Sequence, residues 1–385
     1  MEHGSENGVE RLMAMEPTAV MAGVRCGAIS RRELGKLFGA LGLTTALGTL
    51  LGEETARAQS NELTMVIWEG YADPSFAAKF EEENDATVNA TPMSSSDDAF
   101  GRLQAGGGSN FDLVSASNDV SQRLIDAGLV QPIDPSRLTN YENLYEQFQT
   151  PDYITKDGEL YGANFAWGPT LMLYNTEEVT EEPTSWRALL DEQYAGKIST
   201  WNAPIQIAQY ALLLDPKPED PYVLDEDQLA QVRDILVEQR PLIRTYWNLG
   251  DELKQLYASG EVVISDAWPY VGLGLKEQGV PVAEVIPEEG VTGWSDSWML
   301  TSGAQNVDLA YKWMDYMIGP DGQMGVLNNN GYAITNRAVI EELDPELREA
   351  LLMDNIEEGY DSILMWRNVP NYDQWLAIWQ EVTAG

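Results

Sequence analysis

Residues 63–71 read Leu-Thr-Met-Val-Ile-Trp-Glu-Gly-Tyr, an apolar run that ends in an aromatic and acidic turn. The run predicts a β-strand over 63–68, and Asp73-Pro74 then predicts a helix start, because proline is favoured in the first turn of a helix. Further strands are predicted over 88–91 and 111–114, with helices over 99–104 and 120–127. This alternation predicts an α/β fold whose strands pair in parallel through crossover helices.

A second α/β region is predicted from about Trp167 onward, and the chain contains no internal repeat. Its predicted strands cover 171–174, 262–265 and 297–300, and its predicted helices cover 186–190, 206–214, 229–238 and 310–317. Ligands bind such sheets at the carboxyl ends of the strands. The polar and aromatic turns at 68–71 and 115–119 follow strands, so we expect them at a binding site.

The charge balance excludes one broad class of partner. The chain has 62 acidic and 23 basic residues, a net charge of −39. Phosphate and anionic lipid are bound through Lys and Arg, so we expect no binding to nucleic acid. The acidic residues are scattered along the chain. This distribution indicates a generally acidic surface, as in a protein that works in high salt, rather than a binding site for one ligand.

The first 58 residues have the pattern of an export signal. Ser30-Arg31-Arg32 precedes an apolar run over 37–51, and Ala56-Arg57-Ala58 is a small-x-small cleavage site. The arginine pair resembles a twin-arginine signal, and the apolar run is too short for a spanning helix. Cleavage before Gln59 removes seven acidic and six basic residues. It leaves 55 acidic and 17 basic residues, and so a net charge of −38.

Cleavage also removes the only cysteine, Cys26, and the only histidine, His3. The exported protein would therefore have no disulfide, no cysteine nucleophile, no histidine base and no ordinary zinc site. Gly106-Gly107-Gly108 is not followed by Lys-Ser/Thr, so it does not predict a phosphate-binding loop. We expect a binding protein rather than an enzyme, without metal or cofactor. A glycoside-processing enzyme with paired carboxylates is the less favoured alternative.

From about residue 64 to residue 380 the chain resembles the spermidine/putrescine-binding periplasmic proteins of ABC importers. The order and spacing of several short motifs carry the resemblance. They are 67–71 (IWEGY), 112–114 (DLV), 128–134 (GLVQPID), 138–144 (LTNYENL), 166–168 (AWG), 183–186 (PTSW), 194–197 (YAGK), 293–297 (GWSDS) and 330–332 (NGY).

The resemblance implies a two-lobed periplasmic-binding-protein fold of type II, with a ligand cleft between hinged lobes. The first lobe is expected to comprise 60–167 plus 297–340, and the second 168–296 plus 341–385. It further implies an exported monomer, in the periplasm or on the outer face of the membrane. Its implied partners are a small cationic organic ligand and the membrane permease of an ABC importer.

The resemblance also implies the residues that hold the ligand: an aromatic box, a polar contact, an anionic anchor and a further contact. Ring faces pack on alkyl carbons and attract ammonium groups, and a carboxylate accepts a charge-assisted hydrogen bond. The aromatic box comprises Trp68, Tyr71, Trp268, Trp294 and Tyr332. Ser117 is the polar contact, Asp296 the anion and Gln380 the further contact.

One departure from the family pattern leaves the ligand open. Polyamine binders usually have two acids in the turn that here reads Thr-Trp-Asn-Ala-Pro-Ile over 200–205, without an acid. Glu69 or Asp119 could replace the missing charge. If neither does, the ligand carries one cationic group only.

Other ligand classes fit the sequence less well. A sugar binder also uses aromatic faces and remains an alternative. A ferric-ion binder would need clustered tyrosines, and an anion binder would need basic residues near the cleft. Asp296 beneath aromatic rings favours a cation, because an unpaired buried carboxylate is costly.

Overall fold

The computed structural model describes residues 61–384, and its first sheet has seven strands. Their order is β13-β6-β12-β3-β1-β2, with β14 beside β12. The strands are β1 (Glu62–Ile67), β2 (Thr87–Pro92), β3 (Leu113–Ser117), β6 (Gly162–Pro169), β12 (Thr292–Leu300), β13 (Ala333–Ile334) and β14 (Leu364–Met365). β1 pairs in parallel with β2 and β3, so the carboxyl ends of β1 and β3 meet at one edge.

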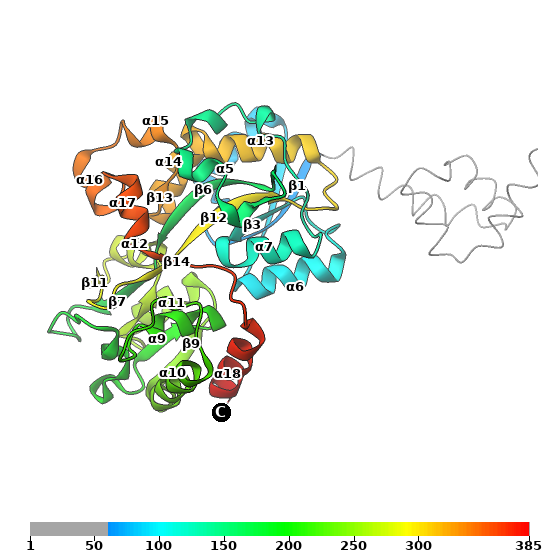
Figure 1. Cartoon of the computed structure of the whole chain (residues 1–385). Coiled ribbons are helices and arrows are strands. Elements are labelled where there is room, and N and C mark those ends of the chain that lie inside the picture. Colours follow the sequence, from blue (N-terminus) through cyan, green and yellow to red (C-terminus); the bar gives the residue numbers. More distant parts are fainter. Residues whose placement is uncertain (1–60, 385) are drawn as a thin grey trace, which may run out of the picture. The chain divides into compact units, whose positions relative to one another are not determined.

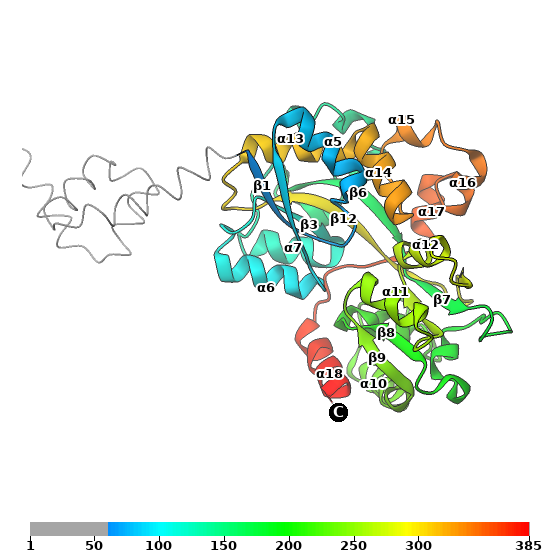
Figure 2. The same cartoon turned by 180° about the vertical axis from the view of Figure 1, so that it is seen from behind.

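The second sheet has five strands in the order β11-β7-β10-β8-β9. They are β7 (Leu171–Asn175), β8 (Ile198–Trp201), β9 (Ile243–Trp247), β10 (Ile264–Ala267) and β11 (Val282–Val285). A small hairpin of β4 (Thr155–Lys156) and β5 (Glu159–Leu160) stands apart. We call the part of the chain around the seven-stranded sheet the first lobe and the part around the five-stranded sheet the second lobe (Figures 1 and 2).

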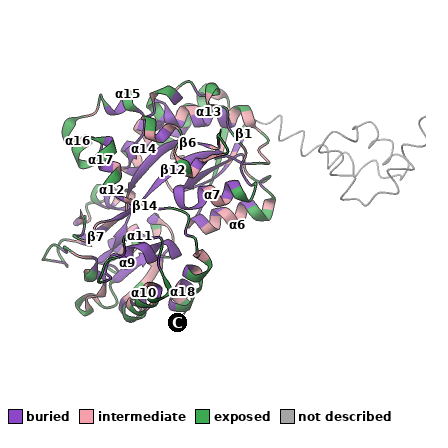
Figure 3. Cartoon of the chain, in the orientation of Figure 1, coloured by how far each residue is buried: buried purple, intermediate pink, exposed green. Residues whose placement is uncertain are grey.

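Helices cover the sheets, whose strands are largely buried (Figure 3). The helices near the first sheet include α5 (Pro74–Asn84), α6 (Ser96–Gly106), α7 (Asn118–Asp126), α8 (Glu146–Gln149), α13 (Val307–Ile318) and α14 (Pro320–Asn330). Those near the second include α9 (Ile207–Ala211), α10 (Glu226–Gln239), α11 (Gly250–Ala258) and α12 (Pro269–Glu277). α15 (Arg337–Ile340), α16 (Pro345–Ala350) and α17 (Ile356–Asp361) follow α14, and the final helix α18 (Tyr372–Ala384) packs on α10.

The chain passes between the lobes at three places. β6 runs almost directly into β7, β11 leads back to β12, and the segment after β14 leads to α18 (Figure 1). This arrangement confirms the predicted two-lobed α/β fold. The exact residues at which each lobe begins and ends stay a prediction.

The first five elements match the sequence-based expectation closely, and some of the later ones differ from it. α5 begins at Pro74 as predicted, and Asp73 caps it by accepting a hydrogen bond from the Ser75 amide at 2.8 Å. Parallel pairing does not extend to β12, which is antiparallel to both β3 and β6 because the chain enters it from the other lobe. β6 and β9 were not predicted, and the helix expected over 206–214 is α-helical only from Ile207 to Ala211.

The predicted export signal over 1–58 lies outside the described residues. No helix within 61–384 is long and apolar enough to cross a membrane.

A buried carboxylate ties the first sheet to the loop before α13. Asp112, only 1% exposed, accepts hydrogen bonds from the Thr64 amide (2.9 Å) and hydroxyl (2.8 Å). Its other oxygen accepts from the amides of Gln305 (2.7 Å) and Asn306 (3.0 Å). Four charge-assisted bonds therefore join three distant segments at the start of the fold.

We expect Asp112→Ala to lower the free energy of unfolding by about 2–4 kcal/mol, because it leaves buried donors without an acceptor. Chemical denaturation measures the change. Asp308→Ala is the control, since this side chain is 94% exposed and its loss should cost less than about 0.5 kcal/mol. A loss below about 1 kcal/mol at Asp112 would contradict the assigned role.

Candidate functional site

A cavity lies where the carboxyl ends of β1 and β3 face the second lobe. Eight of the ten predicted site residues line it, together with two that were not predicted. The predicted ones are Trp68, Glu69, Tyr71, Ser117, Trp268, Trp294, Asp296 and Tyr332, and the other two are Tyr270 and Trp366. Residues from both lobes therefore meet in one place, although the first and last of them, Trp68 and Trp366, are 298 positions apart in the sequence.

The Asp296 carboxylate is the centre of this cavity. It lies on β12 opposite Ser117 in the strand register, and it is 2% exposed. The Ser117 hydroxyl donates to one carboxylate oxygen and the Tyr71 hydroxyl to the other, each at 2.5 Å. No lysine or arginine in the described part of the chain pairs with it. Burial raises the pKa of Asp296 to about 7, although the two hydroxyl donors lower it.

Aromatic rings wall the cavity on the side of the first lobe. The Trp68 indole donates to the Ser117 hydroxyl at 3.0 Å, which fixes its ring beside the carboxylate. Trp294 precedes Asp296 by two residues on β12, so both side chains lie on one face of the strand. Tyr332 packs edge-on against Trp294, with ring centroids 4.4 Å apart.

The wall contributed by the second lobe is a cluster of tryptophans. Trp268 packs edge-on against Trp247 and Trp201, with centroid distances of 4.8 and 5.2 Å. Trp201 in turn stacks on Trp366 at 5.4 Å, with ring planes only 14° apart. Trp268 also contacts Trp68 of the first lobe at 5.6 Å, so the cluster closes the cavity.

Asp266 lies beneath this cluster and is fully buried. Its carboxylate accepts hydrogen bonds from the Trp247 indole, the Trp201 amide and the Thr200 hydroxyl, each at 2.9 Å. Burial raises its pKa to about 6. Because Asp266 does not line the cavity and already has three donors, its role is to hold the tryptophans in position.

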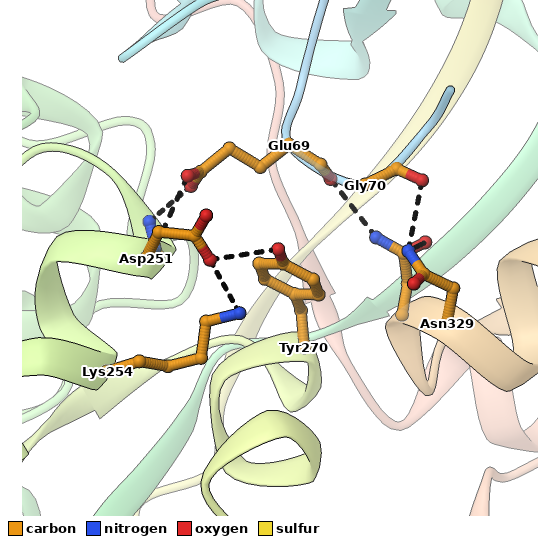
Figure 4. A network of polar contacts seen from close by, with 8 residues as sticks. Glu69, Gly70, Asp251, Lys254, Tyr270 and Asn329 are labelled. Carbon is orange, nitrogen blue, oxygen red and sulfur yellow. Dashed lines mark hydrogen bonds and ion pairs between the residues drawn. The ribbon is translucent and has the colours of Figure 1, made fainter. Parts of the chain in front are cut away.

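Glu69 links the two lobes (Figure 4). Its carboxylate accepts hydrogen bonds from the backbone amides of Gly250 and Asp251, at the start of α11. Burial raises the pKa of Glu69, as does the neighbouring Asp251, whereas the two amides and Lys254 lower it. The carboxylate thus caps a helix N-terminus of the other lobe, where the helix dipole favours negative charge.

The turn that carries Glu69 needs a glycine. Gly70 has φ of +85°, and a Cβ atom there would lie 2.3 Å from the side-chain nitrogen of Asn330. Asn329 and Asn330 donate to the carbonyls of Gly70 and Glu69 at 3.2 and 3.1 Å (Figure 4). α14 therefore fixes this turn from the side.

Two predicted residues lie outside the cavity. Asp119 is buried on α7 and accepts a hydrogen bond from the Ser96 hydroxyl at 2.8 Å, and burial raises its pKa to about 6. Gln380 is exposed on α18, next to the buried Trp379. Tyr270 could have been found from the turn that contains Trp268, whereas Trp366 follows a two-residue strand that has no sequence signal.

The cavity is almost closed by its own side chains. Its volume is about 10 Å³, which is room for a single water molecule. A larger ligand therefore enters only when the rings or the lobes move apart. A wider groove of about 530 Å³ lies behind Tyr332, between α12 and α16, but its carboxylate, Glu284, is paired with Lys276 at 2.6 Å. Within 61–384 no three His, Cys, Asp or Glu side chains gather as metal ligands would.

Comparisons with known proteins agree with this architecture. The chain is 26% identical over 340 residues to the putrescine-binding periplasmic protein PotF of Escherichia coli. The match covers 84% of this chain and 89% of the relative. It is also 26% identical over 316 residues to the spermidine/putrescine-binding periplasmic protein of the same organism. This match covers 78% of this chain and 86% of the relative.

A solved structure shows the same fold with another ligand. The binding protein AgtB from A. tumefaciens R10, in complex with agropinic acid, superposes with a TM-score of 0.70 at 18% identity. The match covers 85% of this chain and 99% of that protein. The fold alone thus does not decide the ligand. Residues 75–353 match the family described as bacterial extracellular solute-binding protein, and the chain belongs to that family.

Proposed function

We propose that this protein captures a polyamine or a related small organic cation in the cavity at Asp296 and delivers it to the permease of an ABC importer. The observation that carries the proposal is the Asp296 carboxylate itself. It is buried among aromatic rings, accepts from two neutral hydroxyls and has no cationic side chain within residues 61–384 as a partner. A buried carboxylate of this kind is costly until a cation pairs with it.

The aromatic walls support the same ligand class. The faces of Trp68, Trp268 and Trp294 would contact the alkyl part of an amine and attract its ammonium group. The relatives named for putrescine and spermidine add independent support. Their family is extracellular, which confirms the predicted location outside the cytoplasmic membrane. Because these relatives are binding proteins, we expect release of an unchanged ligand and no hydrolysis of it.

Binding should depend on the charge of Asp296. Asp296→Asn is expected to weaken the binding of putrescine or a related amine at least about 30-fold, or about 2 kcal/mol, because the charge is lost while the side-chain shape is kept. Calorimetric titration at pH 8 measures this. Asp308→Asn is the matched control at an exposed position and should leave affinity unchanged.

Either of two results would contradict the proposed function. One is unchanged amine affinity in Asp296→Asn. The other is tight binding of a sugar without binding of any amine, which would assign the same aromatic cavity to the alternative ligand class.

The affinity for an amine should also rise with pH through neutrality. The ligand pairs with the ionised carboxylate, and the pKa of Asp296 is raised to about 7, whereas alkyl amines stay protonated to about pH 10. Affinity should therefore fall about tenfold from pH 8 to pH 6. Titrations of the wild-type protein and Asp296→Asn across this range test the prediction, since the variant should show a flat profile.

A further inference from the structure

We infer that the ligand of this cavity carries one cationic group, held at Asp296, and that its other end is uncharged. The inference rests on the proposed function and narrows it to a class of ligand. It follows from the positions of the carboxylates relative to the two walls of the cavity.

Among residues 61–384 only two carboxylates line the cavity, those of Asp296 and Glu69, and they are not equivalent. Asp296 has two hydroxyl donors and no positively charged partner in the part of the chain that the structure describes. Glu69 is held by two backbone amides at the N-terminus of α11, whose dipole compensates its charge. An ammonium group that enters the cavity therefore finds an uncompensated charge at Asp296 alone.

The wall across from Asp296 offers rings in place of a second anion. β8 ends at Trp201, whose ring stacks between Trp247 and Trp366. The next turn, up to Ile205, contains no acid. Asp266 lies underneath, fully buried and bonded to three donors, so a ligand in the cavity does not reach it.

The indole groups that line the cavity also disfavour a second ammonium. The Nε1 atoms of Trp268, Trp294 and Trp366 are buried and have no acceptor among the described residues. An indole N–H only donates, and so does an ammonium, so the two cannot pair. A ring face attracts a cation, but this attraction is several times weaker than the cost of removing an ammonium from water without a counter-charge.

Three amines of equal length test the inference on the wild-type protein. Putrescine, 4-aminobutan-1-ol and pentylamine share one ammonium and a four-carbon chain, and differ only in the terminal ammonium, hydroxyl or methyl group. In calorimetric titrations at pH 8 we expect at least one of the two monocations to bind ten times more tightly than putrescine, and its binding to be lost in Asp296→Asn.

The possible outcomes are distinct. Tighter binding of putrescine than of both monocations would overturn the inference and leave the proposed function standing. Binding of none of the three amines, nor of spermidine, would overturn both.

A pair of variants tests the role of the opposite wall. Trp366→Glu and Trp366→Gln have nearly the same shape, and only the first adds a carboxylate to the cavity. We expect putrescine to bind at least ten times more tightly to Trp366→Glu than to Trp366→Gln, with pentylamine showing no such gain. Thermal melting of both variants checks that they are folded. Equal putrescine affinity in two folded variants would contradict the inference that a missing anion on this wall excludes diamines.

Discussion

The uncompensated charge of Asp296 is the constraint around which the site is built. Its two hydrogen-bond donors come from the turn after β1 and from the end of β3, and the residue itself lies on β12, which returns from the other lobe. The parallel pairing of β1 with β3 and the antiparallel pairing of β12 with β3 therefore together determine the position of this side chain and its donors. A folded protein tolerates such a group at a cost in stability, and proteins accept that cost mainly at functional sites.

The second lobe serves the site in a different way. Asp266 is as deeply buried as Asp296, yet it is fully satisfied by donors from Trp201, Trp247 and Thr200. It fixes tryptophans instead of meeting a ligand. The two buried carboxylates thus illustrate how the number and kind of donors around an acid separate a structural role from the binding role that we propose for Asp296.

The sequence predicts the local part of this architecture well. The strands and helices from residue 63 to residue 127 follow periodicity and capping, which depend on neighbouring residues. The turn around Trp68 and the pair of Trp294 and Asp296 could be assigned because each lies beside a strand end. These residues do line one cavity, and whether they bind ligand stays a prediction.

What the sequence did not reveal depends on contacts between distant segments. β6 lacks a distinct pattern because it is buried on both faces. β9 is a partly exposed edge strand whose residues do not alternate between buried and exposed. Trp366 enters the cavity only because β14 pairs with β12, 72 residues earlier. Gln380 is exposed, and Asp119 is hydrogen-bonded to Ser96. The surroundings of these two side chains depend on how α18 and α7 pack against the rest of the protein, and not on the sequences of the two helices.

The contact between Glu69 and α11 has a kinetic consequence. It joins the lobes with the protein's own groups, and the Trp201 indole adds a second such bond, to the Ser94 carbonyl at 3.2 Å. The closed arrangement is therefore stabilised in part by bonds within the protein, and these bonds must break whenever the lobes separate. Release of a bound solute would then be limited by the rate at which these bonds break, because the lobes must separate before a solute can leave the cavity.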